Sequence, residues 1–550
     1  MKIFRIIFLI VIVFGCSVAQ EKKTPHSFGD QGDGTYINPI LNSDYPDSDV
    51  VRYGDKYYMI SSKQHMSPGM IILESYDMVN WKIINHVYAN ISWSSKYNWD
   101  KMAGYKRGVW AGDLAYHDGT WYCYVIDPNN GLFVSSTDDI YGKWSTPKKM
   151  LSSNKVGDDP SVFWDDENKQ AWLVANIGRS KTEVDKDKYL FKNAIFKMSW
   201  DGMNIEDEGT VFYKGTGAEA SKIYKINNQW FIFLSEWSTT SDGQKEDRKQ
   251  IALRSKTNSI YGPYDRKVLL ERGNDFVRSC SQGSLNQAPD GSWWYYHQLI
   301  QNSDDPFEGR PQCLQPVEWI DGWPIIGKDI DNDGIGEPLR RYKMPNIKAP
   351  EKLEIQTSDD FSTPELGHQW EWNHNPRNSH WSLTQRKGWM RLKASTLVSL
   401  PRNEIPFWRA SNTLSQRMMG TKASTGMAKI DVSGMEKGQR AGFVRFGGVS
   451  HLIGVRMDNE GNRNIFFMDD KGIEIVGPTV EKEIIYFKTS NIGKVASFQY
   501  SYDNNHFESF GKEFELGFGR WTGDRLGFYC WNDIEESGYI DIDWFRYEYE

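Results

Sequence analysis

Three acidic residues in short, separated motifs could do chemistry in this chain. They are Asp47 in the run Asp-Tyr-Pro-Asp-Ser-Asp, Asp159 in Gly-Asp-Asp-Pro-Ser, and Glu219 in Gly-Ala-Glu-Ala-Ser. Where such carboxylates converge, one can protonate a leaving oxygen and another can activate water, which is the chemistry of glycoside hydrolysis. An isolated acid of this kind is more often a turn former or a strand-end charge. Their chemistry therefore depends on a fold that brings them together.

A repeated turn followed by aromatic residues predicts such a fold. Five times a polar turn runs directly into aromatic strand residues, and the copies centre on Tyr57, Trp121, Trp172, Trp230 and Trp293. They recur about every fifty to sixty-five residues, which is the period of a four-stranded propeller blade. Five copies predict a five-bladed β-propeller, whose inner strands would bring the acids to one end of the central channel. A β-sandwich with coincidental turns is the alternative.

Length and patterning divide the chain further. A chain of 550 residues is longer than a single hydrophobic core usually organises, so more than one domain is expected. Residues 344–350 contain two prolines and no periodicity, as a linker does, and alternating strand patterns follow. We predict an all-β protein with a signal peptide at 1–19, a flexible leader at 20–34, the propeller at 35–340, a linker at 341–358 and a β-sandwich at 359–550.

Composition narrows the class of partner. Aromatic residues make up 14% of the chain and include 23 Trp, which fits a β-protein and, where rings stay exposed, sugar binding. Core packing is the ordinary role of any single Trp. The formal net charge of -8 argues against nucleic acid and against an anionic membrane surface as partners.

The first fifteen residues have the pattern of an export signal. Lys2 and Arg5 precede an apolar run that is too short to span a membrane with its flanks. Two processing routes stay open, because residues 17–19 (Ser-Val-Ala) form a small-residue cleavage site and residues 13–16 (Val-Phe-Gly-Cys) resemble a bacterial lipobox. We expect an exported bacterial protein that is periplasmic, secreted, or lipid-anchored at the cell surface through Cys16.

The other cysteines lack the spacing of a metal site. Cys123, Cys280, Cys313 and Cys530 are widely scattered and form no Cys-x-x-Cys pair, so no zinc site is predicted. A disulfide between Cys280 and Cys313 is one interpretation. Buried thiols are the other.

Four separated motifs resemble glycoside hydrolase family 43. They are residues 38–50, the Asp-Pro-Ser at 159–161, residues 219–224, and residues 309–319 together with Asp-Gly-Trp-Pro at 321–324. They follow the family's order over about residues 36–340. The resemblance implies a five-bladed propeller and an exo-acting, inverting hydrolase, in most cases a β-xylosidase or an α-L-arabinofuranosidase.

The resemblance also implies a role for each acid. Asp47 would be the general base, Asp159 the acid that orients and tunes its partner, and Glu219 the general acid. An inverting enzyme must fit a water between base and sugar, so the carboxyl groups of Asp47 and Glu219 should stand roughly 6.5 to 9.5 Å apart. The negative charge of Asp159 would help Glu219 to hold a proton near neutral pH.

Four further residues are predicted to contact the substrate. Arg310 would bind a sugar hydroxyl or hold a carboxylate, with a structural ion pair as the alternative. Trp110 matches the family's aromatic residue at that place, while His65 could wall the pocket or be a packed, hydrogen-bonded histidine. Gln282 lies in Ser-Gln-Gly, where the family often carries His before Gln-Gly. Glu219 is followed by Ala-Ser where the family usually has Gly-Pro, and these departures put substrate detail in doubt.

The predicted chemistry requires no cofactor. Residues 329–334 (Asp-Ile-Asp-Asn-Asp-Gly) have the oxygen spacing that opens a calcium loop, but position 340 is Arg where the closing Glu should stand. A turn that closes the last blade is the simpler interpretation, and calcium stays open as a ligand.

The C-terminal part resembles the concanavalin-like β-sandwich that accompanies the family's propellers. It could be a carbohydrate-binding module or a wall of the active site, and the short linker predicts that it packs on the propeller.

Together these features predict an exported exo-glycosidase that releases terminal xylose or L-arabinofuranose from plant cell-wall polysaccharides or oligosaccharides. The alternative is a catalytically silent carbohydrate-binding surface protein. The presence of all three acids favours the enzyme, because a binding protein needs no spaced acid and base.

Overall fold

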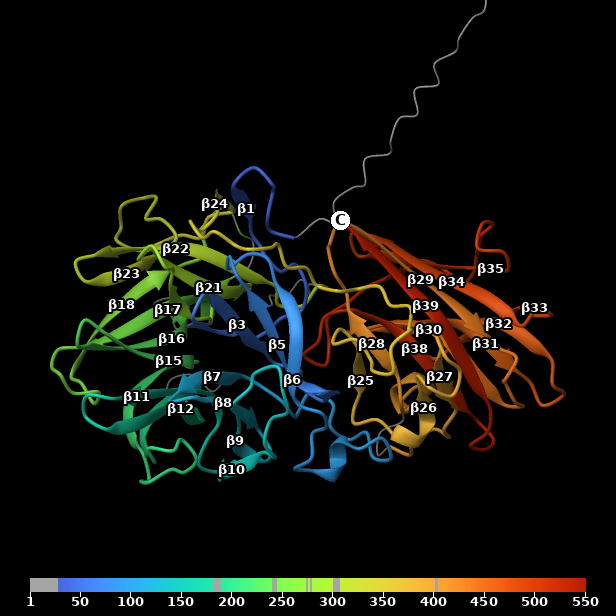
Figure 1. Ribbon diagram of the computed structural model, residues 1–550, viewed down its shortest axis with the longest axis horizontal. Helices are drawn as coiled ribbons and strands as arrows, with labels where there is room; N and C mark the ends of the chain where they lie inside the picture. The colour runs from blue at the N-terminus through green and yellow to red at the C-terminus, as the bar shows by residue number, and fades with distance from the viewer. Residues whose placement is uncertain are drawn as a thin grey trace, which may run out of the picture.

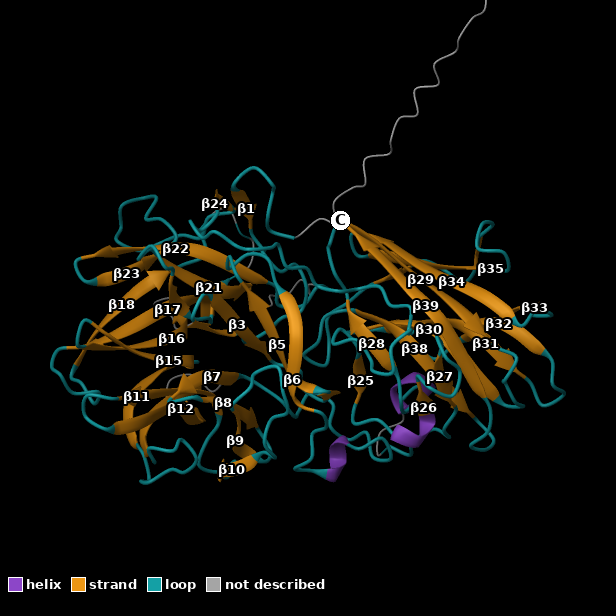
Figure 2. Ribbon diagram, in the orientation of Figure 1, coloured by secondary structure: helices purple, strands orange, loops and turns teal. Residues whose placement is uncertain are grey.

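The computed structural model describes residues 28–181, 189–239, 245–273, 276, 279–299, 307–400 and 404–550. The predicted signal peptide lies outside these residues. Within them, β-strands dominate, and the helices are three short 3-10 turns, η1 (Ser95–Tyr97), η2 (Asn378–His380) and η3 (Pro406–Arg409) (Figure 2). No helix in this part of the chain combines the length and the apolar character needed to cross a membrane.

Five antiparallel sheets form the N-terminal domain (Figure 1). The first two blades contain β2 (Asp49–Tyr53), β3 (Lys56–Ser61), β5 (Gly69–Ser75) and β6 (Lys82–Tyr88), then β7 (Gly112–His117), β8 (Thr120–Asp127), β9 (Gly131–Thr137) and β10 (Lys148–Leu151). The next two contain β11 (Asp158–Asp165), β12 (Gln170–Lys181), β13 (Tyr189–Met198) and β14 (Thr210–Thr216), then β15 (Glu219–Ile226), β16 (Gln229–Thr239), β17 (Lys245–Ser255) and β18 (Tyr264–Leu270). The last contains β19 (Cys280–Ser281), β20 (Leu285–Gln287), β21 (Trp293–Leu299), β22 (Gln312–Ile320) and β23 (Trp323–Ile326). The predicted five-bladed propeller is confirmed.

Four of the five predicted aromatic repeats lie in the second strand of a blade, and the fifth, at Trp293, begins β21. Tyr57, Trp121, Trp172 and Trp230 are all at least nine-tenths buried, in strands β3, β8, β12 and β16. The repeat therefore marks the layer in which neighbouring blades pack on each other. The four cysteines in the described part of the chain are buried thiols, which is one of the two interpretations of their spacing.

Residues beyond the last blade return to the start of the propeller. Strand β24 (Arg341–Lys343) pairs with β1 (Thr35–Ile37). Asn38 Nδ2 donates hydrogen bonds to the carbonyl oxygens of Leu314 and Leu339, at 2.8 and 2.9 Å. The predicted linker, residues 341–358, thus begins with a strand that belongs to the propeller.

Two eight-stranded sheets form the second domain. The first runs in the order β33 (Glu474–Thr479), β32 (Arg463–Met468), β31 (Ser450–Met457), β30 (Gln439–Phe446), β38 (Arg525–Asn532), β28 (Leu414–Arg417), β25 (Glu371–Asn373) and β4 (Met66–Ser67). The second contains β26 (Trp381–Ser382), β27 (Met390–Lys393), β39 (Tyr539–Tyr549), β29 (Ala423–Asp431), β34 (Ile484–Ile492) and β35 (Val495–Ser501), with β36 (Glu508–Ser509) and β37 (Phe514–Glu515) both paired to β35. Strand β4 comes from the first blade region, so the propeller supplies an edge strand to the sandwich.

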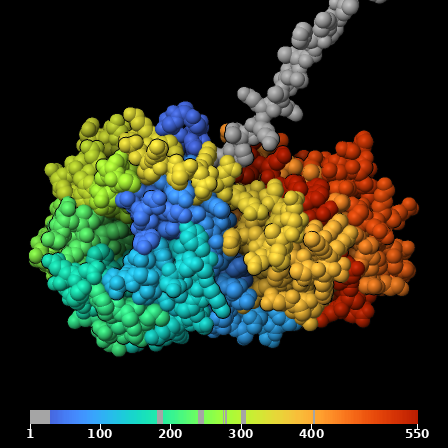
Figure 3. All heavy atoms as spheres, in the orientation of Figure 1, coloured from blue at the N-terminus to red at the C-terminus, as the bar shows by residue number. Residues whose placement is uncertain are grey.

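A buried ionic cluster joins the two domains, which pack directly against each other (Figure 3). Glu371 on β25 accepts from Lys63 of the propeller at 2.8 Å, from Arg417 at 3.1 Å and from Arg525. Burial acts to raise the pKa of Glu371, but these three cations outweigh it and hold that pKa well below its usual range. Burial lowers the pKa of Lys63 to about 7, although Glu371 opposes the shift. The expected packing of the second domain on the propeller is confirmed.

Ending the chain at Pro350 should give an insoluble or inactive propeller. The truncation removes Glu371 and leaves Lys63 without its carboxylate, and it also strips the partner strand from β4. Breaking a buried ion pair costs about 3 to 5 kcal/mol. The soluble fraction, the thermal unfolding temperature and the hydrolysis of pentosides measure the effect. A soluble, fully active fragment that has lost only its affinity for insoluble polysaccharide would show that residues 359–550 are an independent module.

Candidate active site

Bulges at the starts of two inner strands carry the candidate acids. The pairing of β11 shifts register after Asp158, and the pairing of β15 shifts after Glu219. A bulge sets two residues against one and re-aims their side chains. Asp159 and Ala220 sit in these bulges with φ of 48° and 59°, and Asp47 has φ of 53°. Left-handed backbone is uncommon outside glycine and tends to mark functional sites.

The three predicted acids meet at one end of the channel. Asp47 and Asp159 line a single pocket, together with Gln282. Asp159 Oδ2 accepts the backbone N–H of Ala220 at 2.7 Å, which ties it to the residue after Glu219. The sequence motifs are therefore brought together as predicted, while the spacing of the Asp47 and Glu219 carboxyl groups stays a prediction.

A buried lysine closes the channel next to this pocket. Lys222 Nζ lies 2.8 Å from Asp49 and 3.0 Å from Asp113, so it links the inner strands of three blades. Burial acts to lower the pKa of Lys222, but the two carboxylates raise it overall. Burial also raises the pKa of Asp113 to about 6, against the opposing charge of Lys222. The pocket consequently has a fixed, charged floor.

Four side-chain donors hold the carboxylate of Asp47. Arg310 Nη1 lies 2.7 Å from Oδ1, and Gln282 Nε2 and Gln298 Nε2 donate to the same oxygen at 3.1 and 3.3 Å. Ser62 Oγ donates to Oδ2 at 2.8 Å. Arg310 thus holds a carboxylate, one of the roles expected for it. These donors fix the orientation of the Asp47 carboxylate, which a general base needs in order to reach the proton it abstracts.

Asp159 has no cation of its own in hydrogen-bond contact among the described residues. Burial raises its pKa to about 7, and the charges of Glu219 and Asp47 add to the effect. Burial likewise raises the pKa of its neighbour Asp158 well above the usual range, helped by the charges of Asp159, Glu219 and Asp47. Near neutral pH this side of the pocket therefore retains protons.

Arg248 is a contact of Glu219 that sequence reasoning missed. Its Nη2 lies 2.5 Å from Glu219 Oε1 and donates to the carbonyl oxygen of Gly217, while its Nε donates to Ser235 Oγ at 2.7 Å. Ser235 Oγ in turn lies 2.7 Å from Ser281 Oγ. Ser281 stands where the family often carries His. The missing histidine was the one signal in the sequence that the residues around Glu219 differ from those of the family.

Trp110 lies at the rim of the site, where it meets an aromatic residue of the second domain. The ring centroids of Trp110 and Trp521 are 6.5 Å apart, and the Arg310 guanidinium lies 5.8 Å from the Trp521 ring. Trp521 is 43% exposed and belongs to the loop between β37 and β38. No local motif marked this residue, because only the fold brings that loop to Arg310.

Asp44 joins this loop to the base. Its Oδ1 accepts the backbone N–H of Arg310 at 3.1 Å, and its Oδ2 accepts the N–H of Gly523 at 2.9 Å. The N–H of Asp524 donates to the carbonyl oxygen of Phe307 at 2.6 Å. The sandwich thereby fixes the backbone that carries Arg310, and through it the carboxylate of Asp47.

The structure contradicts the expectation that His65 walls the sugar pocket. His65 is 1% exposed and lies in the domain interface, where its Nε2 is 3.1 Å from Asn373 Oδ1. Its ring packs on Tyr105 and His374 at 4.7 and 4.8 Å between centroids. The next residue begins β4, which joins the second domain, so the histidine is carried into the interface. It is the packed, hydrogen-bonded histidine of the alternative interpretation.

The carboxylates of the calcium-like loop do converge. Ligand oxygens of Asp329, Asp331 and Asp333 lie within 4.8 Å of one another. Asp329 also accepts the N–H groups of Asp333 and Gly334, as the acid of a tight turn does. Both interpretations of the loop are compatible with this geometry, and calcium stays a prediction.

Replacing Asp159 by asparagine should make stability less sensitive to pH. With a pKa raised from 3.8 to about 7, the folded chain binds more protons than the unfolded chain between these values, so stability falls as the pH rises through them. The amide of asparagine cannot ionise, so the variant avoids this loss of stability. We expect the difference in unfolding temperature between Asp159→Asn and the unchanged chain to be more favourable to the variant at pH 8 than at pH 5, by about 2 °C or more. Calorimetry at the two pH values measures this, with exposed Asp166→Asn as control. An equal change in unfolding temperature at both pH values would contradict a buried Asp159 carboxyl with a raised pKa.

Comparisons with known proteins agree with this architecture. The family described as "Glycosyl hydrolases family 43" matches residues 36–324, and the "Beta xylosidase C-terminal Concanavalin A-like domain" matches residues 358–548. A Formosa agariphila protein named "Beta-xylosidase" is 54% identical, over 98% of this chain and 97% of its own. A Bacteroides ovatus protein named "Non-reducing end alpha-L-arabinofuranosidase" is 27% identical, over 82% of this chain and 79% of its own.

Solved structures share the two-domain fold. A "Bifunctional GH43-CE" protein of Bacteroides eggerthii superposes with a TM-score of 0.78 at 28% identity, over 93% of this chain, which spans 63% of that protein. A "xylan beta-1,4-xylosidase" of Bacillus halodurans also gives 0.78, at 22% identity, over 93% of this chain and 99% of its own. The match over more than half of the chain and the 54% identical relative establish that this chain belongs to glycoside hydrolase family 43, as a glycosidase of the β-xylosidase and α-L-arabinofuranosidase type.

Proposed function

We propose that this chain is an exported, exo-acting β-xylosidase that releases terminal xylose from xylo-oligosaccharides and plant cell-wall xylan with inversion. The observation that carries the proposal is the meeting of Asp47, Asp159 and Glu219 at one channel mouth, with Arg310 on Asp47, Arg248 on Glu219 and no cation in contact with Asp159 among the described residues. The 54% identical relative named a β-xylosidase favours xylose over the other pentose. Release of terminal L-arabinofuranose is the second candidate, which the more distant Bacteroides ovatus relative supports.

Asp47 is the proposed base. Arg310, Gln282, Gln298 and Ser62 bond to both of its oxygens, which fixes the direction of the carboxylate. A water held by such a carboxylate can attack the anomeric carbon while its proton passes to Asp47. Attack on the face opposite to the leaving group inverts the anomeric configuration.

Glu219 is the proposed acid. Its carboxylate pairs with Arg248 through Oε1, at 2.5 Å from Nη2. Asp159 lies beside it and, with its pKa raised to about 7, retains a proton near neutral pH that can pass to Glu219. The proton then passes from Glu219 to the leaving oxygen as the glycosidic bond breaks.

A closed pocket supports exo action. Lys222 and its two aspartates block the channel on one side, and Trp521 stands at the rim with Trp110. A site closed in this way admits the end of a chain. The contact between Trp521 and Trp110 also favours the second domain as a wall of the active site over its being a free binding module.

Export is part of the proposal and is supported by the N-terminal pattern. Lys2 and Arg5 precede the apolar run, and both a soluble and a lipid-anchored product at Cys16 fit the residues that follow. The substrate class agrees with this place, because cell-wall polysaccharide lies outside the cell. Family membership favours the enzyme over the catalytically silent binding protein.

Glu219→Gln should separate substrates by their leaving groups. We expect turnover of xylobiose to fall by about 10²- to 10⁴-fold, because its leaving sugar needs protonation, and turnover of aryl xylosides with acidic phenols to fall far less. Steady-state kinetics on both substrates measure this, with exposed Glu206→Gln as the control. Equal losses on both substrates would count against Glu219 as the acid.

The first sugar released should carry the inverted configuration. Proton NMR of the anomeric signals in the first minutes of xylobiose hydrolysis reads this before mutarotation mixes the products. Asp47→Asn should lower the turnover of natural and aryl substrates alike, by about 10²-fold or more, because both need the attack of water. A product that keeps the configuration of the substrate would overturn the role of Asp47.

A further inference from the structure

A cavity of about 680 Å³ lies between the propeller and the sandwich. Its walls come from three parts of the chain, namely residues 28, 40–41 and 79–81, residues 353–358, and residues 423–425 with 547–550. Asp47, Asp159 and Glu219 are not among them. Binding sites for small molecules typically measure about 300 to 1,000 Å³ and often lie at domain interfaces.

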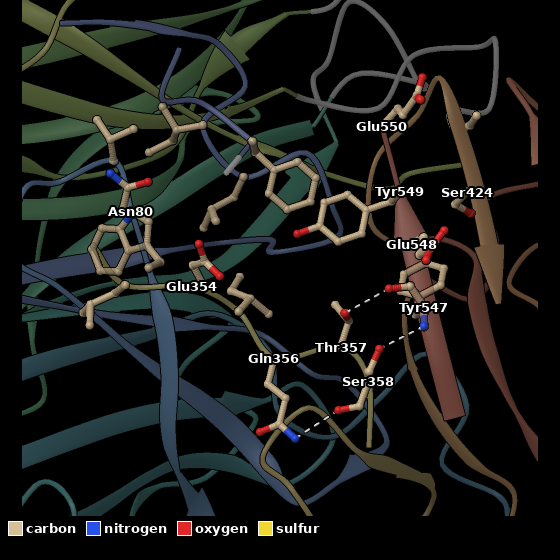
Figure 4. A pocket seen from close by; sticks show the side chains of 18 of the residues that line it. Asn80, Glu354, Gln356, Thr357, Ser358, Ser424, Tyr547, Glu548, Tyr549 and Glu550 are labelled. Carbon is tan, nitrogen blue, oxygen red and sulfur yellow. Dashed lines mark hydrogen bonds between the residues drawn. The ribbon is translucent and has the colours of Figure 1, made fainter. Parts of the chain in front are cut away.

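One buried polar atom on the wall of this cavity has no hydrogen-bond partner among the described residues. Asn80 is 2% exposed, and its Nδ2 donates to Asp77, but its Oδ1 has no partner. The carboxylate of Glu354 and the hydroxyl of Tyr549 extend toward each other from opposite walls (Figure 4). Buried polar atoms are almost always satisfied in folded proteins, so the orphaned amide oxygen points to a ligand or solvent that donates a proton there.

Aromatic and aliphatic side chains form part of the cavity wall. The rings of Phe28 and Tyr549 stack with centroids 5.0 Å apart, and Trp81, Leu353 and Ile355 extend the apolar wall. By contrast Thr357 and Ser358 use their hydroxyls on β39 (Figure 4). Apolar walls with a few convergent polar groups suit a sugar ring, whose carbon face packs on apolar side chains while its hydroxyls bond at the edge.

Charge narrows the ligand further. Glu354, Glu548 and Glu550 line the cavity, and no Lys or Arg of the described residues does. An anionic ligand is therefore disfavoured. The carboxylates are not gathered for a metal either, because the one close group of three such ligands in the described part of the chain is Asp329, Asp331 and Asp333. A neutral ligand rich in hydroxyl donors fits the acceptors best.

We propose that this interdomain cavity is a second, non-catalytic binding site for a short segment of a neutral xylo-oligosaccharide. The hydroxyls of the sugar would donate to Glu354, Glu548 and Asn80 Oδ1, and its carbon face would lie on the apolar wall. The choice of xylose rests on the proposed function. Such a site would hold the polysaccharide on the enzyme without taking part in the reaction.

Titration calorimetry with xylohexaose tests the proposal in the full-length Glu219→Gln variant, whose turnover of natural xylo-oligosaccharides is expected to fall by about 10²- to 10⁴-fold. We expect two classes of site. Adding Glu354→Gln and Glu548→Gln should weaken one class by at least about tenfold, since charged acceptors are lost, and leave the other unchanged. Thr425→Trp, which fills the cavity from β29, should abolish the same class.

Controls make the outcome specific. Glu513→Gln with Glu535→Gln removes the same charge from exposed positions that do not line the cavity, and should change neither class. In the otherwise native chain, Glu354→Gln and Glu548→Gln should leave aryl xyloside hydrolysis intact. A single class of site, or two classes that survive both cavity variants, would overturn the proposal. Failure to hydrolyse any pentoside would overturn the proposed function alone, because the binding measurement needs no turnover.

Discussion

Repulsion among carboxylates at the channel mouth is the constraint on which the rest of the site depends. Asp47, Asp158, Asp159 and Glu219 are close enough that each acts electrostatically on Asp159 or on its neighbour. Two arginines offset part of this repulsion, because Arg310 pairs with Asp47 and Arg248 pairs with Glu219.

The central pair receives no such cation among the described residues, so its charge is limited by proton uptake. Hydrolysis of a glycoside requires a carboxylate that activates water on one side and a proton donor on the other, and the retained protons lie on the side of Asp158 and Asp159. The strained backbone at Asp47 and Asp159 is the local cost of holding them in this arrangement.

The second domain takes part in this balance. Asp44 bonds at once to the backbone of Arg310 and to Gly523 of the sandwich, and Arg417 reaches back to the carbonyl oxygen of Ser62, whose hydroxyl holds Asp47. The buried cluster around Glu371 keeps the two domains in register over these contacts. Residues of the propeller and of the sandwich therefore both position Asp47. This shared role explains why the sandwich packs on the propeller and is joined to it by a short linker.

Sequence reasoning reached the parts of the structure that are encoded locally. The aromatic repeats predicted the blades because each copy fills the same layer, and the acid motifs could be assigned because each sits in a distinctive turn. Arg248 escaped, since it lies inside a strand with no motif of its own, and Trp521 escaped because the fold alone brings it to Trp110. His65 was assigned to the wrong surface because β4, which follows it, pairs with a distant strand.

The departures from the family pattern show how one geometry can be kept by different groups. Ala220 adopts φ of 59°, a conformation that costs roughly 1 to 2 kcal/mol without glycine, and the family usually has glycine there. Ser221, in the place of the usual proline, donates to the carbonyl oxygen of Asp159 at 2.6 Å and holds the same bulge from the side chain. Ser281, in the place of the usual histidine, joins Ser235, which binds Arg248. Of these three replacements, Ser221 bonds to Asp159 and Ser281 bonds to the serine that binds Arg248, so groups that differ from the usual ones of the family surround the acid that must give up its proton.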